Sequence, residues 1–427
     1  MLYKGINLSK LEDNEVLFFT RIHGKKGIFG EYYPYSFLNK FEGVKEFRTI
    51  SEYPVGDVHI NINLNNLKNI TNEDFSLFEE LLDIEDIIIR CRALRSISYE
   101  ESKQLIWVVA KFFLDYFNKN PSLKVVVSLI VDNYVMDIME RFCKHFNIEV
   151  IQLIGFFVPG YIRFTDRFGV GIPVRLVSEN EVDSVYNRLV TKQESHLAIS
   201  QSRALKNICK DYLSYRYRYF FRYLIGYKLK GNLSYEYRFS RVFKGFHSLL
   251  KYNVSKFFDD IIDIKESPSK LIFIPLHFHP EATVDYWSDK KEHADYVNSL
   301  LKTIAMCKSL GLKVVFKEHP NYYLRRSPDF YSKIKSSKNC YLLNPFVSTQ
   351  DVFDISDNIC VYTGSAGFEA IMLDKKVYTV SENYYSFNRL PSLSEYNKEY
   401  YTFFSLEEKK DLIERVLETT FVIQLNG

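Results

Sequence analysis

Residues 359–373 constrain the fold of this chain most, because they join an apolar run to a helical pattern through a glycine-rich turn. Residues 359–362 are typical of a short buried strand, and residues 368–373 have the spacing of a helix. The turn between them is Thr363-Gly364-Ser365-Ala366-Gly367. A strand, a tight turn and a helix in this order indicate one unit of a parallel sheet. The sequence therefore predicts an α/β fold.

The same turn is a candidate anion site. At the start of a helix, backbone N–H groups and the helix dipole favour negative charge, and glycine lets a phosphate approach the backbone. We expect the N–H groups of Ser365 and Ala366 to hold a phosphate, with Gly364 allowing the approach. Thr363 adds a hydroxyl, and Glu369 lies one turn into the helix. The alternative is that the glycines only permit a tight turn and close helix packing.

A second apolar run also ends in polar residues. Gly311 marks a helix end, residues 313–317 follow as a strand, and Glu318-His319-Pro320 stop it. His319 can donate to a phosphate oxygen, and protonation would add charge. Ligands bind at the carboxyl ends of parallel strands, so we expect this strand end and the glycine-rich turn to share one site. Glu318 or Glu369 would then hold the ribose hydroxyls of the nucleotide.

A third run, residues 271–274, leads into His277, His279 and Glu281. We regard His277 and Glu281 as candidate catalytic groups. His-x-His spacing places two imidazoles on one face of an extended segment, which is also a pattern of metal ligands. No further His or Cys stands nearby at ligand spacing, and the chain has no Asp-x-Asp motif. We therefore expect no metal.

These three elements together resemble a known family. In order they are Pro-Leu-His-x-x-Pro-Glu at 275–281, Lys-Glu-His-Pro at 317–320 and Thr-Gly-Ser-Ala-Gly-x-Glu-Ala at 363–370. This order is similar to that of bacterial capsule and surface polysaccharide biosynthesis proteins related to the Kdo transferases of capsule assembly. The resemblance is strong over the C-terminal third and loose over the N-terminal half. His279 departs from it, because a neutral polar residue such as glutamine is expected there.

The resemblance implies a GT-B glycosyltransferase, with two Rossmann-like domains facing across a cleft. It implies a CMP-activated acidic sugar donor, of the Kdo or nonulosonic acid type, and a capsule or surface glycan acceptor. By position, His319 and Ser365 match the residues that contact the nucleotide and its phosphate in that group. A UDP-sugar-dependent transferase or epimerase stays open, because a phosphate site does not identify the base. A non-catalytic assembly protein is the third interpretation.

The N-terminal half predicts a second Rossmann-like domain. Candidate strands are residues 16–19, 86–89, 124–131 and 149–154, and candidate helices are residues 99–117 and 134–146. Asp132 directly follows one of these strands, where a catalytic base or nucleophile is expected. An aspartate before a helix is also a common N-cap. Other candidates in this half are His23, Asp57, His59 and Asp166.

Arginines form a further pattern. Arg90, Arg92 and Arg95 follow one candidate strand, and Arg163 and Arg167 flank an aspartate in a turn-rich stretch. Guanidinium groups suit carboxylates and phosphates, so Arg90, Arg92 and Arg163 are candidates for the donor carboxylate or the acceptor. The alternative is a solvated basic edge.

Residues 201–251 are strongly basic, with twelve Lys or Arg against two acids, and aromatic residues are interleaved with them. We expect a helical linker in peripheral contact with the anionic inner membrane, because each basic residue near such a surface contributes about 1 kcal/mol. Nucleic acid is the less favoured partner, since no nucleic-acid-binding motif is present.

Length and composition agree with a large two-domain enzyme. The chain has 427 residues, 46% of them hydrophobic, and a net charge of +3. It has no apolar stretch long enough for a bilayer and no signal-peptide pattern at its start, so we expect a cytoplasmic protein without a cofactor. Six cysteines form no close pair, which predicts reduced, mostly buried thiols. The expected parts are an acceptor-side domain (1–190), a basic helical linker (191–266), a nucleotide-sugar domain (267–400) and a C-terminal helix packing back (401–427).

Overall fold

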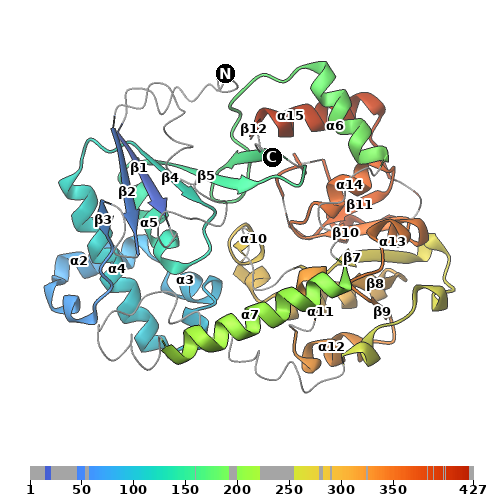
Figure 1. Ribbon diagram of the computed structural model, residues 1–427, viewed down its shortest axis with the longest axis horizontal. Coiled ribbons are helices and arrows are strands. Elements are labelled where there is room, and N and C mark those ends of the chain that lie inside the picture. Colours follow the sequence, from blue (N-terminus) through green and yellow to red (C-terminus); the bar gives the residue numbers. More distant parts are fainter. Residues whose placement is uncertain are drawn as a thin grey trace.

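The computed structural model in Figure 1 shows two α/β units side by side, each built on one central sheet. The structure describes residues 15–20, 46–52, 57–158, 160–191, 200–221, 254–277, 282–288, 291–323, 326–381, 383–387, 389–397, 399 and 401–422. The expectation of a two-unit Rossmann-like α/β fold is confirmed.

The first sheet has seven strands in the order β12-β6-β5-β4-β1-β2-β3. Strands β1 to β5 are parallel, and β6 pairs antiparallel with both β5 and β12. The central order 3-2-1-4-5 is that of a Rossmann sheet, whose switch point lies between β1 and β4. The bounds are β1 Glu15–Thr20, β2 Glu46–Ser51, β3 Val58–His59, β4 Val125–Leu129, β5 Glu149–Gly155, β6 Tyr161–Thr165 and β12 Thr420–Val422.

Helices cover one face of this sheet. They are α2 Asn72–Leu81, α3 Ile84–Arg90, α4 Tyr99–Lys119 and α5 Tyr134–His145. Helix α4 begins where the Ser98 side chain accepts a hydrogen bond from the Glu101 N–H, and its apolar stripe, including Phe113 and Phe117, is buried in the core. The opposite face forms a smaller core in which Phe164 of β6 packs against Phe421 of β12.

The second sheet has five parallel strands in the order β11-β10-β7-β8-β9. This is again the order 3-2-1-4-5, and its switch point lies between β7 and β10. The bounds are β7 Leu271–Pro275, β8 Lys313–Lys317, β9 Cys340–Leu343, β10 Asn358–Val361 and β11 Lys376–Thr379.

Helices cover both faces of the second sheet. They are α10 Ala282–Asp285, α11 Tyr296–Ser309, α12 Pro328–Lys335, α13 Thr349–Ile355 and α14 Ala366–Met372. Helices α11 and α12 pack on one face, and α13 and α14 on the other. Gly311, between α11 and β8, has φ 71°, as a helix C-cap glycine requires.

The chain passes between the units more than once. Helix α6 (Glu179–Thr191) follows the first sheet but packs on α14 of the second unit and on α15 (Leu406–Glu418). After α15, strand β12 returns to the edge of the first sheet. Helix α7 (Gln201–Phe221) runs across the front in Figure 1 and contacts the 3-10 turn Pro320–Tyr322. Most of the rest of the basic segment lies outside the described residues.

One expected element is wrong. Residues 86–89 are helical, within α3, and not a strand. The Asp83 side chain accepts a hydrogen bond from the Asp86 N–H and starts the helix, while Ile87 is buried against α4 and α5. A short apolar run fits a buried helix as well as a strand, so periodicity did not separate the two. The arginines from 90 onward therefore follow a helix.

Candidate functional site

The switch point of the second sheet brings the ends of β7 and β10 together. The Thr363 N–H, just past β10, donates to Nε2 of His277, just past β7, at 3.5 Å. A Cβ atom at Gly364 would lie 3.3 Å from Cε1 of this imidazole. The glycine-rich turn therefore packs directly against His277, so two of the three predicted strand ends, those of β7 and β10, meet.

The end of β8 is fixed by a buried ion pair. Glu318 is fully buried, and its carboxylate accepts from Nε of Arg326 at 2.7 Å, the Tyr331 hydroxyl at 2.9 Å and the His319 N–H at 2.7 Å. Arg326 also donates to the His277 carbonyl. With three donors inside the protein, Glu318 holds the strand ends in place.

Lys317, the last residue of β8, interacts with Glu369 of α14. Lys317 is 9% exposed, and its ammonium donates to the Thr349 hydroxyl at 3.2 Å. Burial raises the pKa of Glu369 to about 7, opposed by the charge of Lys317 and a hydrogen bond from Ser365. Burial lowers the pKa of Lys317 to about 8, opposed by the charge of Glu369. The two groups therefore interact without forming a close ion pair.

Both strand-end histidines are neutral near pH 7. Burial lowers the pKa of His277 to about 3, helped by the charges of His319 and Arg326. Burial lowers the pKa of His319 to about 4, helped by Lys317 and Arg326. The interactions form a closed ring from Lys317 through His319, His277 and the 363–365 turn to Glu369. This ring lies at the carboxyl edge of the second sheet, where β7, β8 and β10 end.

The helix that follows the turn explains its second glycine. A Cβ atom at Gly367 would contact the Tyr385 hydroxyl, which itself donates to the Gly364 carbonyl at 2.6 Å. Gly367 is therefore needed for close packing, as the structural alternative predicted. Helix α14 has only seven residues, and no side chain of the described residues caps its first turn. The N–H groups of Ser365 and Ala366 stay predicted phosphate donors, on a helix end with a short dipole.

Several aromatic and hydroxyl groups at this site were missed by sequence reasoning. The Tyr296 hydroxyl accepts from the His277 N–H at 2.8 Å. The ring centroids of Tyr362 and His293 are 6.2 Å apart, and Nδ1 of His293 is 2.6 Å from the Ser288 hydroxyl. These residues lie on different segments with no shared motif, so no sequence pattern identified them.

On the first unit, Asp132 is not the cap of α5. The Asn133 side chain accepts from the Met136 N–H and takes that role. Asp132 instead pairs with Arg92, with 3.6 Å between Oδ2 and Nη2. Asn133 also donates to Glu52 at 2.8 Å, so a carboxylate that sequence reasoning missed lies at the end of β2. The structure thus brings Asp132 and Arg92 together at the carboxyl edge of the first sheet.

Arg90 joins the two units. It is 4% exposed, and its Nη1 donates to the carbonyls of Asp285 at 3.1 Å and Ser288 at 2.8 Å, while its Nε binds Asp86. Arg95 binds the Asp285 carboxylate at 3.0 Å. Arg90 therefore links the two units through hydrogen bonds. It binds backbone carbonyls there, and its role toward the donor carboxylate or the acceptor stays a prediction.

Arg163 forms a second interdomain contact. Its guanidinium lies 3.7 Å from the centroid of the Tyr384 ring and 5.6 Å from that of Trp287, and it donates to the Gly169 carbonyl at 3.1 Å. Gly169 has φ 77°, and a Cβ atom there would lie 2.6 Å from Trp287. Burial lowers the pKa of Arg163 to about 10. This arginine is 2% exposed and packed between the units.

The other candidates are dispersed. The N–H and hydroxyl of Thr49 donate to Asp57, and Asp166 accepts from the N–H groups of its own turn, which indicates structural roles for both carboxylates. His59 ends β3, at the far edge of the first sheet. Pro320 is buried at the start of its 3-10 turn. His23, His279 and Glu281 lie outside the described residues.

The part of the chain that the structure describes holds no group of three or more potential metal-ligating side chains. None of the helices in this part has the length and apolarity needed to span a membrane.

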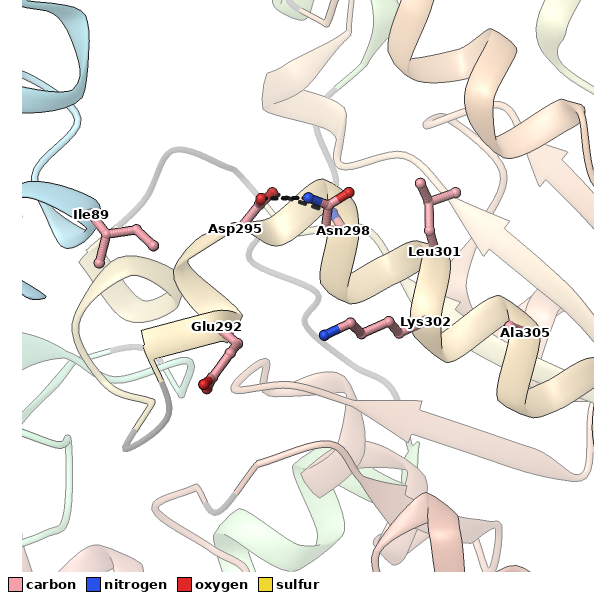
Figure 2. A pocket seen from close by; sticks show the side chains of 7 residues that line it. All are labelled: Ile89, Glu292, Asp295, Asn298, Leu301, Lys302 and Ala305. Carbon is pink, nitrogen blue, oxygen red and sulfur yellow. Dashed lines mark hydrogen bonds between the residues drawn. The ribbon is translucent and has the colours of Figure 1, made fainter. Parts of the chain in front are cut away.

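A separate hollow of about 530 Å³ lies between α3 and α11. Figure 2 shows its lining, with Lys302 and Glu292 among the polar side chains around it. The lining residues are Ile89, Glu292, Asp295, Asn298, Leu301, Lys302 and Ala305. None of them belongs to the ring around Lys317 and His319, so the hollow is distinct from the strand-end site.

The fold and this strand-end site define a two-unit α/β protein with a cluster of polar groups at the switch point of its second sheet. Residues 192–418, more than half of the chain, match the model of the family described as capsule polysaccharide biosynthesis proteins. The chain belongs to this family. A comparison with curated proteins found no match.

Solved structures with a similar arrangement include two enzymes. One is the beta Kdo 2,7 transferase KpsC of Thermosulfurimonas dismutans, with 14% identity over 74% of this chain and 84% of that chain and a TM-score of 0.36. Another is the UDP-GlcNAc 2-epimerase of Methanocaldococcus jannaschii, with 14% identity over 97% of this chain and 92% of that chain and a TM-score of 0.23. At these values no residue of either protein is equated with a residue of this chain.

Proposed function

We propose that this protein is a glycosyltransferase that moves an acidic sugar, of the Kdo or nonulosonic acid type, from a CMP-activated donor to a capsule or other surface glycan. The observation that carries the proposal is the ring of polar groups at the switch point of the second sheet. Parallel α/β sheets bind ligands at this place, and the family builds capsule polysaccharide.

The donor phosphate would lie within the ring. His319 and the N–H groups of Ser365 and Ala366 would bind its oxygens, and Glu369 would accept from ribose hydroxyls. When the glycosidic bond to the phosphate breaks, negative charge develops on the leaving nucleotide. Hydrogen-bond donors held in place around that charge lower the activation barrier, and such electrostatic stabilisation is often the largest catalytic effect. The neutral histidines donate through one N–H each.

The acceptor side would be the carboxyl edge of the first sheet. The carboxylate of Asp132, held by Arg92, would take the proton of the acceptor hydroxyl as that oxygen attacks the anomeric carbon. Arg92 also supplies a guanidinium for the donor carboxylate. Arg90 and Arg163 would act indirectly, because both fasten the units that carry the two halves of the site.

Calorimetry with CMP, UDP and GDP tests this function. We expect tight binding of CMP alone and a loss of about tenfold or more in His319→Ala, since a hydrogen bond to a charged group contributes roughly 1.5–3 kcal/mol. Tight binding of UDP instead favours the UDP-sugar transferase or epimerase, and no binding of any nucleotide favours a non-catalytic assembly protein.

The proposed transfer needs no metal ion, and the proposed enzyme contacts the membrane through its basic segment. Phosphate charge would be neutralised by protein groups, so donor turnover should continue in EDTA, and full loss of activity there contradicts a metal-independent transfer. The basic segment would bring a cytoplasmic enzyme to the inner face of the membrane, where lipid-linked acceptors lie. Binding to anionic vesicles should then weaken with salt and when Arg216, Arg218 and Arg222 are changed to Ser.

A further inference from the structure

Lys317 is a buried cation with unused donors. It is 9% exposed, yet among the described residues its ammonium has one hydrogen-bond acceptor, the Thr349 hydroxyl at 3.2 Å, and no carboxylate within ion-pair distance. An ammonium carries three donors, and a buried charge is costly unless it is paired. Two donors of Lys317 therefore lack a protein partner within the described part of the chain.

A second unused group lies in the same ring. The hydroxyl oxygen of Thr363 is buried, and no hydrogen-bond partner for it exists within the residues that the structure describes. The Thr363 backbone is tied to His277, whose ring interacts with His319 and through it with Lys317. Apart from the Glu369 carboxylate, the unused groups of the ring are thus donors, or hydroxyls able to donate. Such a set fits a ligand group that offers only acceptors and carries negative charge.

We propose that Lys317 is the cation that binds the phosphate of the donor nucleotide, that the Thr363 hydroxyl contributes a further donor from the end of β10, and that phosphate binding draws protons onto the site. This inference rests on the proposed function. It assigns Lys317 to the phosphate because a phosphate offers acceptors alone, whereas ribose and sugar hydroxyls both donate and accept. Glu369 is the group that suits those hydroxyls.

Among the residues that the structure describes, three charged or titratable groups act on Lys317. They are Glu369 on α14, Glu318 at the end of β8 and His319 after it, and Thr349 of α13 is the neutral neighbour. Arg326 acts on His319 but is neutralised by Glu318. Without a ligand, burial lowers the pKa of Lys317 to about 8 and that of His319 to about 4. A bound phosphate opposes both shifts, so the complex takes up protons near pH 8.

Calorimetry on the full-length protein tests the inference, with CMP and the phosphate-free nucleoside cytidine as probes. Lys317→Met should weaken CMP binding by about 10- to 100-fold, the effect of one charge-assisted hydrogen bond, and leave cytidine binding unchanged. Lys302→Met removes an exposed lysine from the separate hollow on α11 and is the matched control, with unchanged CMP binding. In buffers of different ionisation enthalpy, wild type should take up protons at pH 8 and Lys317→Met should take up fewer.

Equal CMP affinity in wild type and Lys317→Met overturns the inference, as does an equal loss for CMP and cytidine. If Lys317→Met does not fold, the wild type decides alone, because its CMP affinity must fall as pH rises through about 8. A flat profile with no proton uptake refutes the assignment. Wild type that binds no nucleotide refutes the proposed function itself, which is a different outcome from CMP binding that ignores Lys317.

Discussion

Replacing Glu318 with Gln tests how the strand-end site is held together. Glu318 is fully buried, and its two oxygens accept from Arg326, Tyr331 and the His319 N–H at 2.7–2.9 Å. Glutamine offers one oxygen and one NH₂ group, so in either orientation the NH₂ group faces a donor. The substitution also leaves the guanidinium of Arg326 buried without a counter-charge.

The expected cost is large for a single isosteric change. One lost charge-assisted hydrogen bond costs roughly 1.5–3 kcal/mol, and breaking a buried pair by removing one partner costs roughly 3–5 kcal/mol in all. We expect Glu318→Gln to lower the free energy of unfolding by this amount and to weaken nucleotide binding, since Arg326 also holds the His277 carbonyl. Urea denaturation followed by circular dichroism measures the change, with an unchanged slope.

Two variants make this test decisive. Glu408→Gln breaks the pair with Arg389, in which both side chains are more than one-third exposed, and we expect an unchanged denaturation midpoint. Glu318→Gln with Arg326→Met leaves neither charge buried, so it should recover part of the lost stability. A midpoint for Glu318→Gln equal to that of Glu408→Gln refutes the reasoning.

Three other predictions concern the interdomain contacts, the pH dependence and the acceptor side. Arg163→Met removes the stack on Tyr384, which is worth about 2 kcal/mol when desolvated, and should lower the midpoint of thermal unfolding. Arg163→Lys should lower this midpoint less. Equal midpoints for Arg163→Met and wild type contradict a stacking role. The pKa of Glu369 is raised to about 7, so its contribution to stability is complete below its ordinary 4.5 and lost as pH rises through 7. Glu369→Gln should therefore gain stability relative to wild type as pH rises across this window, and a constant difference in denaturation midpoint argues against the buried carboxyl. Asp132→Asn should reduce transfer at least 100-fold with unchanged nucleotide affinity, while Asn133→Ala, which removes the helix cap, should lose about 1 kcal/mol of stability. Full transfer activity in Asp132→Asn excludes it as the base.

The sequence predicted the second unit more fully than the first. Residues 271–274, 313–317 and 359–362 are apolar runs bounded by turn residues, and all three became neighbouring parallel strands. In the first unit, β2 and β6 mix polar and apolar residues, so no local pattern marks them as strands. They form because they pair with strands distant in sequence. Residues 86–89 show the same limit, since burial against α4 and α5 decided between helix and strand.

The candidate site also contains residues that the sequence predicted and residues whose role only the fold shows. His277, His319 and the 363–365 turn were predicted because each follows a recognisable strand. Lys317 was within a quoted motif but its importance depends on burial, which only packing reveals. The roles of Arg90 and Arg163 depend on partners about 200 residues away in sequence, such as Ser288, so a local pattern of arginines had no means of showing an interdomain contact.

Strand β12 has a consequence for protein engineering. It pairs with β6 after the chain has built the whole second unit, and Phe421 closes an apolar face of the first sheet against Phe164. The first unit is therefore discontinuous in sequence. A hybrid enzyme that exchanges one unit for another family member's requires two junctions, one near α6 and one before β12. A single crossover would leave the edge of β6 open, and an open apolar strand edge invites aggregation.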